Sequence, residues 1–303
     1  MPTKSELEGR ASRIVQIFQK AMPPVPVPYP AIIICTHRTY RDQRAFLVYK
    51  MGSAAIAAPA EEQAVELIAG TKGTALLIRK EEVPSLDSFY HLLWVALGKF
   101  YISAAHSHHS EDTKETDMGM AFWAVFAPEA IANRVEHFLC IAVGNTKKDI
   151  EWPEEQWRSV YDEIKLGLFA IYGQRNIQIP ELAFYLASTL TDGLLLDLIH
   201  KAREGALPGK EGQPFDSTCM DTMPVEMRKP MEQLIAVLEG QMDQEQYWEA
   251  DEQTLGRIGE LLTSLNDIYV TLIADELIRD ELDAAPIPKV LPEDLFEDLP
   301  EID

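Results

Sequence analysis

The chain has few cysteines and no excess of positive charge. Its 303 residues include three cysteines, Cys35, Cys140 and Cys219, far apart and without a CxxC pair. Such usage is typical of reduced thiols, so we expect a cytoplasmic protein without disulfides. With 49 acidic and 27 basic residues, the formal charge is -22. Because this field repels nucleic-acid phosphates and anionic lipids, we expect no nucleic acid and no membrane as partner, but a peptide or protein, with a basic one favoured.

Long apolar runs and common catalytic motifs are also missing. The most apolar stretch, residues 182–199, contains Asp192 and Asp197, so it predicts a core helix rather than a membrane span. The amphipathic N-terminus lacks the continuous apolar run of a signal peptide. No G-x-S-x-G motif and no phosphate loop with Walker spacing occurs. We therefore expect no cofactor of these classes.

The hydrophobic pattern predicts an α+β protein that is mostly helical, with a small sheet near the N-terminus. Helical spacing over residues 7–22 ends at a proline-rich run. Strand-like segments at 31–35, 45–51 and 74–79 predict the sheet, with a short helix over 60–69. Further helices are predicted over 85–105, 119–138, 154–172, 180–202, 224–239 and 251–282.

Four parts of the chain follow from these elements. Residues 1–204 are predicted to form one domain that holds the small sheet and the long helices. The glycine and proline residues of 205–222 indicate a loop. Residues 223–283 are expected to form a helical part that packs on the first domain, and residues 284–303 an acidic tail containing prolines.

Residues 93–101 carry the framework of a known motif without its chemistry. Their sequence, LWVALGKFY, resembles LWHELGHFY, a frequent form of the HExxH motif of zinc metallopeptidases, the zincins. In that motif two histidines one helical turn apart bind one zinc ion, and the glutamate polarises the metal-bound water. Here Val95 and Lys99 stand at the histidine positions and Ala96 at the glutamate position.

A second segment, residues 122–132, has the sequence FWAVFAPEAIA. It is similar to FWAEFIAEYIA, the setting of the third zinc ligand in the glutamate-ligated branch of the class. Val125 stands at the ligand position, and Glu129 follows one turn later. Valine and alanine cannot bind zinc, and lysine is protonated near neutral pH. The resemblance, which covers residues 30–135, therefore implies a zincin-like fold without metal and without catalytic residues.

The four replaced positions, Val95, Ala96, Lys99 and Val125, are expected to share one pocket. If Lys99 points into this pocket, its ammonium group would take the place of the lost cation and pair with Glu129. The plainer interpretation is a surface lysine whose aliphatic stem covers apolar residues. An ordinary buried amphipathic helix would produce similar letters, so a coincidental likeness stays open as an alternative.

Histidines near this segment form a second candidate site. His106, His108 and His109 lie in HSHHSED, and alternating histidines can bind a transition metal. His91 precedes Val95 by one helical turn. The plainer interpretations are a solvated loop for the first three and a hydrogen-bonded core histidine for His91.

Three functional hypotheses follow. The first is a non-catalytic, zincin-like protein, a pseudoenzyme that binds a peptide or protein in the inherited cleft. The second is a metal-dependent hydrolase with an unconventional site built from His91 and the histidines of the following loop. The third is a helical regulatory protein unrelated to peptidases.

Overall fold

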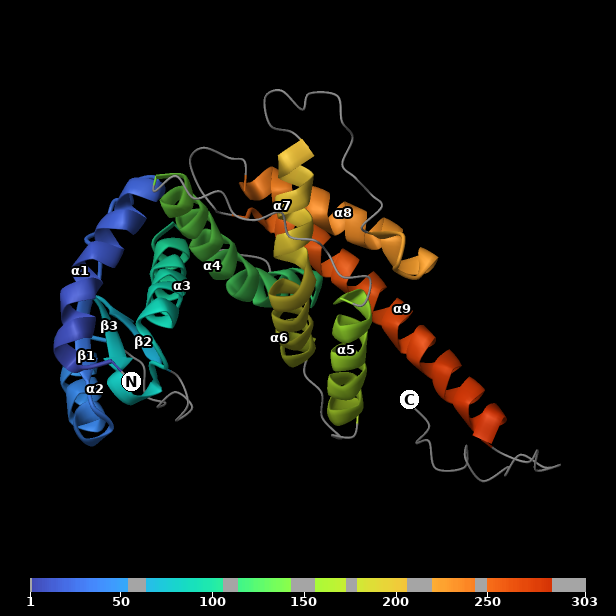
Figure 1. Ribbon diagram of the computed structural model, residues 1–303, viewed down its shortest axis with the longest axis horizontal. Coiled ribbons are helices and arrows are strands. Elements are labelled where there is room, and N and C mark those ends of the chain that lie inside the picture. The colour runs from blue at the N-terminus through green and yellow to red at the C-terminus, as the bar shows by residue number, and fades with distance from the viewer. Residues whose placement is uncertain are drawn as a thin grey trace.

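The computed structural model describes residues 2–53, 64–105, 114–142, 156–172, 179–205, 220–242 and 250–284. Within these ranges the chain is mostly helical with one three-stranded sheet, which confirms the predicted α+β class (Figure 1). Its elements are α1 (Lys4–Ala21), β1 (Ala31–Cys35), α2 (His37–Met51), β2 (Val65–Gly70), β3 (Gly73–Arg79), η1 (Lys80–Glu82), α3 (Leu86–Ala105), α4 (Lys114–Ala142), α5 (Gln156–Tyr172), α6 (Ile179–Leu190), the π-helical turn η2 (Thr191–Leu195), α7 (Leu196–Gly205), α8 (Val225–Met242) and α9 (Glu252–Ala284).

The sheet has the strand order β1-β3-β2, with β1 parallel and β2 antiparallel to β3. Alternate residues of β3 serve two cores, because side chains alternate across a strand. Ala75 and Leu77 pack toward α2 in a small core, whereas Leu76 and Ile78 belong to the main core, which includes residues of α1 and α3. The central strand is therefore covered on both faces.

Residues 45–51, predicted as a strand, form the second half of α2 instead. The helix begins after Thr36, whose hydroxyl and backbone share hydrogen bonds with Thr39, and it ends at Gly52 with a φ of 65°. Caps of this kind favour a helix over the whole segment between them. Leu47 and Met51, one turn apart, then both face the small core.

Residues 60–69 were predicted as a helix, but residues 65–70 form strand β2; residues 60–63 lie outside the described ranges. β2 pairs with β3 around the two-residue turn that follows Gly70. Glu66 and Ile68 are buried at alternate positions, which is the period of a strand. Within β2, backbone pairing with β3 thus outweighs the helical propensity of residues such as Glu66 and Ala69.

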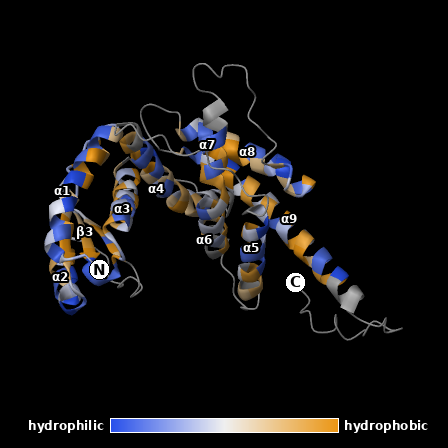
Figure 2. Cartoon of the chain, viewed as in Figure 1, coloured by the Kyte–Doolittle hydropathy of each residue, from blue (hydrophilic) through white to orange (hydrophobic). Residues whose placement is uncertain are grey.

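Helices α3 and α4 approach one another closely at Gly98. A Cβ atom at this position would lie 3.0 Å from the Cα and carbonyl oxygen of Pro128, so only glycine allows this separation without a shift. Apolar residues line the contact, and Figure 2 shows further apolar positions on β3 and where α8 and α9 lie together. The position of this contact determines which side chains of α3 and α4 line the pocket beside it.

The predicted helix over 180–202 consists of three parts, because η2 separates α6 from α7. The C-terminal helices pack on the rest of the molecule mainly through α9, which makes its most extensive contact with α4 and also contacts α8 and α5. Residues 206–219, most of the predicted loop, and the tail from residue 285 lie outside the described ranges. No helix in the described ranges is both long enough and apolar enough to cross a membrane.

Candidate functional site

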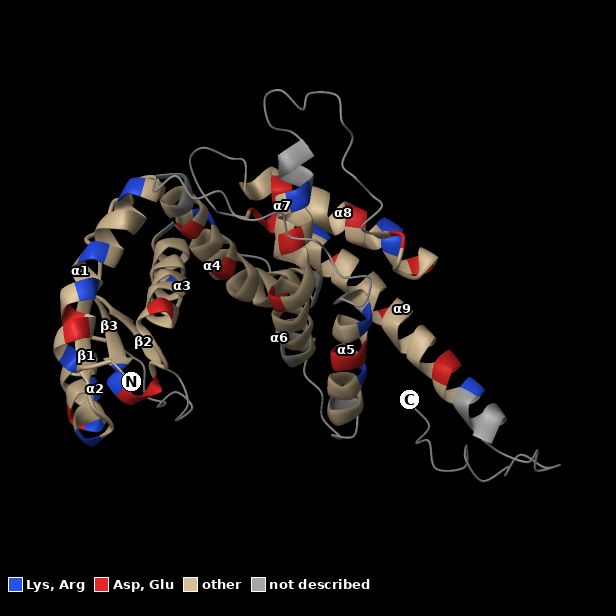
Figure 3. Cartoon of the chain, in the orientation of Figure 1, with Lys and Arg blue, Asp and Glu red and all other residues tan. Residues whose placement is uncertain are grey.

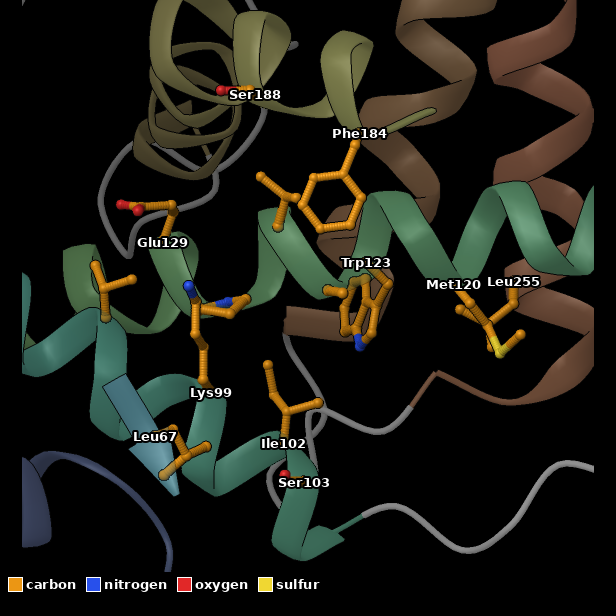
Figure 4. A pocket seen from close by; sticks show the side chains of 14 residues that line it. Leu67, Lys99, Ile102, Ser103, Met120, Trp123, Glu129, Phe184, Ser188 and Leu255 are labelled. Carbon is orange, nitrogen blue, oxygen red and sulfur yellow. The ribbon is translucent and has the colours of Figure 1, made fainter. Parts of the chain in front are cut away.

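A pocket of about 640 Å³ lies between α3, α4 and α6, and we call it the α3–α4 groove. Figure 4 shows Leu67 of β2 and Leu255 of α9 at its opposite ends and Phe184 of α6 above α4. Its lining residues are Leu67, Val95, Lys99, Ile102, Ser103, Met120, Trp123, Ala124, Val125, Pro128, Glu129, Phe184, Ser188 and Leu255. A mostly apolar wall with a few polar groups is typical of a ligand site of this volume.

Three of the four replaced motif positions line this groove. Val95 and Lys99 are one turn apart on α3, so they share a face, and Val125 meets them from α4. Ala96, expected in the same pocket, instead faces the main core and is 6% exposed. Its position, one residue after Val95, turns it about 100° around the helix axis.

The expected ion pair between Lys99 and Glu129 is not formed. Glu129 Oε2 lies 3.0 Å from Nε2 of His91, which occupies the preceding turn of α3. Lys99 is exposed and makes no hydrogen bond or ion pair with any residue that the structure describes. Figure 4 shows its amine reaching from α3 toward α4, with the Glu129 carboxylate turned away from it. His91 is hydrogen-bonded as predicted, but its side chain is half-exposed rather than in the core.

Two further polar groups face the groove from α4. The indole nitrogen of Trp123 is buried and has no hydrogen-bond partner among the described residues, although the residue is only 1% exposed. Figure 4 shows this nitrogen on the side of the groove where Ile102 lies. Pro128 has no amide hydrogen, so the carbonyl of Ala124 loses its usual donor in the helix. The residues that line the groove therefore include an ammonium group, an N–H donor without a described partner and a carbonyl without its usual helical donor.

A smaller pocket of about 210 Å³ lies on the other side of Glu129. His91, Asp192 and Thr191 line it, the last two from the π-helical turn. The hydrogen bond with Glu129 raises the pKa of His91 above its ordinary value, against the effect of burial. Burial, followed by the charge of Glu129, raises the pKa of Asp192. Asp192 stands out in the sequence as a charged residue within the apolar stretch 182–199. That it lies in one pocket with His91 and Glu129 could not be inferred from the sequence.

The histidine-rich loop cannot be placed beside this pocket. His106, His108 and His109 lie outside the described residues, as does Cys219. Within the described part of the chain, no three or more histidine, cysteine or acidic side chains are arranged to hold a metal ion. Cys35 donates a hydrogen bond to the carbonyl of Ile78, and burial raises the pKa of its thiol to about 11. This thiol is a structural group rather than a nucleophile.

A third polar cluster, which sequence reasoning missed, is buried between α2 and the sheet. Arg44 Nε donates to Glu66 Oε1 at 2.9 Å, and Tyr40 donates to Glu66 Oε2 at 2.7 Å. The guanidinium of Arg79 lies 4.9 Å from the centre of the Tyr40 ring. Burial and the bond to Glu66 raise the pKa of Tyr40 to about 12. These groups satisfy one another, so the cluster is structural, although Arg44 also lines a pocket of about 710 Å³ with Tyr49 and Lys72.

No known family model matches the chain, and no significant match occurs among curated proteins or solved structures.

Proposed function

We propose that this chain is a non-catalytic, zincin-like protein that binds a peptide, or a segment of a protein partner, in the α3–α4 groove. One observation carries the proposal. Val95, Lys99 and Val125, at the positions where the related motif has its zinc ligands, line one groove together. None of the three can hold zinc in its ordinary state, so binding without catalysis is the activity that this groove supports.

The surroundings of the groove agree with a zincin-like arrangement. α3 and α4 pack directly on one another, and Gly98 and Pro128 make the close contact. β2 is an edge strand of the sheet, contacts α3, and contributes Leu67 to the groove. A helix pair beside a sheet edge is the arrangement that the sequence resemblance implies.

The chemistry of the lining residues favours binding over hydrolysis. The described residues that line the groove include no histidine and no cysteine. Of the two serines, Ser188 donates weakly to Asp192 at 3.4 Å, a contact without the histidine base that activates serine nucleophiles. Apolar walls that alternate with separate donors and acceptors suit a peptide, which offers apolar side chains and backbone polar groups together.

Peptide binding can be tested by selection from a displayed random library. Ala124 is exposed in the groove, so A124W should fill it. Ala274 is exposed on α9 away from the groove, so A274W is the matched control. Selected peptides should bind the unchanged chain and A274W equally, lose at least about tenfold in affinity for A124W, and stay uncleaved. Peptides that are cleaved, or that bind A124W as well, would contradict the proposal.

The zincin-like geometry has a separate test, the restoration of a metal site. The triple variant V95H/K99H/V125E places two imidazoles one turn apart and a carboxylate opposite them, a zinc ligand set. The control D267H/T271H places an exposed histidine pair on α9. We expect the triple variant to hold one zinc per chain at least about tenfold more tightly than the control, with none retained by the unchanged chain after chelation. Equal zinc affinities for the two variants would argue against the zincin-like arrangement.

A further inference from the structure

The charges of the α3–α4 groove specify its ligand further, if the groove binds a peptide as proposed above. We infer that the ligand is an apolar peptide segment whose carboxylate pairs with Lys99 and whose backbone carbonyl accepts a hydrogen bond from Trp123. Lys99 is the single basic residue among the described lining residues. Glu129 is the single acidic one, and its carboxylate is already bonded to His91. The group that the groove lacks is an anion.

The position of Lys99 makes this cation available. It is exposed and has no ion pair with a described residue, so pairing does not require an existing bond to break. The apolar side chains of Val95, on the same face of α3, and of Val125, on α4, line the groove together with Lys99. A charge-assisted hydrogen bond beside apolar surface is stronger than one in open water, because less water competes for it.

The buried Trp123 nitrogen is the second, independent observation. An unpaired buried N–H group costs free energy, which a ligand acceptor would recover. Figure 4 shows this nitrogen well apart from the Lys99 amine along the groove, so the two donors require two separate acceptors. A carboxylate for one and a backbone carbonyl for the other are both present in a peptide.

The carbonyl of Ala124 distinguishes a peptide from a fatty acid. This carbonyl lacks its helical donor because of Pro128, and Ala124 is one of the residues that line the groove. A peptide backbone can supply the missing N–H group, whereas a fatty acid has no donor. Phe184, a large apolar side chain 52% exposed at the rim, would be covered by an apolar residue of the peptide.

The overall charge of the chain pointed the other way, toward a basic partner. Figure 3 shows the acidic residues spread over several helices rather than gathered in one place, and Glu129 is the single acidic residue among the described residues that line the groove. At physiological ionic strength, charges farther than about 8 Å are largely screened. The contact at Lys99 therefore decides which group is bound, and the net charge of -22 affects mainly the rate of association.

The test uses the full chain and acetylated pentapeptide pools with random Leu, Ile, Val, Phe and Met. One pool ends in a free carboxylate, one in an amide and one in a lysine amide; dodecanoate is the non-peptide carboxylate. The unchanged chain should bind the acid pool about tenfold more tightly than the amide pool. K99M should abolish this difference, K99R should keep it, and K99E should favour the lysine pool. K50M, at an exposed lysine of α2, should behave as the unchanged chain.

The outcomes separate this inference from the proposed function. Equal binding of acid and amide pools by the unchanged chain would overturn the carboxylate while leaving peptide binding intact. If the unchanged chain bound none of the peptide pools, peptide binding itself would be overturned. Dodecanoate binding as tightly as the acid pool would overturn the peptide in favour of a simple apolar acid. W123F, which keeps an aromatic ring but removes the donor, should weaken acid and amide pools alike by about threefold or more; circular dichroism checks its fold, and the Lys99 series does not depend on it.

Discussion

Two regions of the molecule differ in whether their polar groups have hydrogen-bond partners. Between α2 and the sheet, Glu66 is 9% exposed, and its carboxylate accepts hydrogen bonds from both Arg44 and Tyr40. In the α3–α4 groove, Lys99 and the Trp123 nitrogen have no partner among the described residues. Both regions contain charged groups beside apolar surface, but the polar groups of the first are paired with one another and those of the second are not.

The difference separates architecture from binding. A buried polar cluster that satisfies itself holds its elements in one geometry and offers nothing to a ligand. The buried Trp123 nitrogen, which has no partner among the described residues, costs free energy in the free protein, which a ligand with an acceptor would recover. The region under α2 thus specifies the position of the sheet, whereas the groove is where we propose that a peptide binds.

The largest expected effect comes from breaking the satisfied cluster. E66A removes the carboxylate that Arg44 and Tyr40 share, and it leaves a guanidinium 13% exposed without this partner. We expect the free energy of unfolding to fall by about 3–5 kcal/mol, measured by urea denaturation. The control E8Q breaks the exposed pair of Lys4 and Glu8 and should cost at most about 0.5 kcal/mol. Similar losses in both variants would show that the buried cluster adds no particular stability.

A smaller effect is expected where the groove is shaped. G98A adds a Cβ atom that would lie 3.0 Å from two backbone atoms of Pro128. Because backbone cannot move as a side chain does, we expect α3 and α4 to separate slightly, at a cost of about 1–3 kcal/mol in unfolding free energy. Binding of selected peptides should weaken as well.

Gly240 on α8 is the matched control for that substitution, since nothing lies within 4 Å of a Cβ atom there. G240A should stabilise the chain by about 0.5–1 kcal/mol, because alanine is a better helix former than glycine. Equal effects of G98A and G240A would mean that the close approach at Gly98 does not determine the geometry of the groove.

The elements that sequence reasoning predicted are those whose pattern is local. The helix over 85–105 and the strands over 31–35 and 74–79 have long periodic or compact apolar runs, and each was found within one residue. The segment 45–51 was misassigned because its apolar and aromatic residues suit a strand equally well. Its helix depends on the caps at both ends and on the small core that Leu47 and Met51 fill, and packing of that kind is not visible locally.

The groove shows the same limit. Helical spacing was enough to place Val95 and Lys99 on one face, and Pro128 in the sequence could have indicated the free carbonyl of Ala124. The partner of Glu129 could not be inferred, since it depends on how far α3 and α4 are shifted along one another. That shift brings His91, rather than Lys99, to the carboxylate.

The smallest expected effect concerns the hydrogen bond between His91 and Glu129. Glu129 also lines the α3–α4 groove. The hydrogen bond with Glu129 raises the pKa of His91 from its ordinary value of 6.5, and the charges of Glu136 and Asp192 act in the same direction. The folded state therefore favours the protonated ring. Its contribution to stability is complete below pH 6.5 and is lost as the pH rises through the higher pKa of the folded state.

Removing the carboxylate should flatten this dependence. In E129Q we expect the pKa of His91, followed by NMR, to fall toward its ordinary value. Between about pH 6 and pH 8, the unfolding free energy should then decrease less in E129Q than in the unchanged chain. The difference between the two decreases should stay below about 1 kcal/mol, because His91 is half-exposed. H91N should flatten the curve at least as much, since it removes the titrating ring, whereas E129Q leaves the smaller effects of Glu136 and Asp192 on that ring. A pH dependence in E129Q as steep as that of the unchanged chain would show that His91 is bound elsewhere, and Glu129 would then join Lys99 as a free group of the groove.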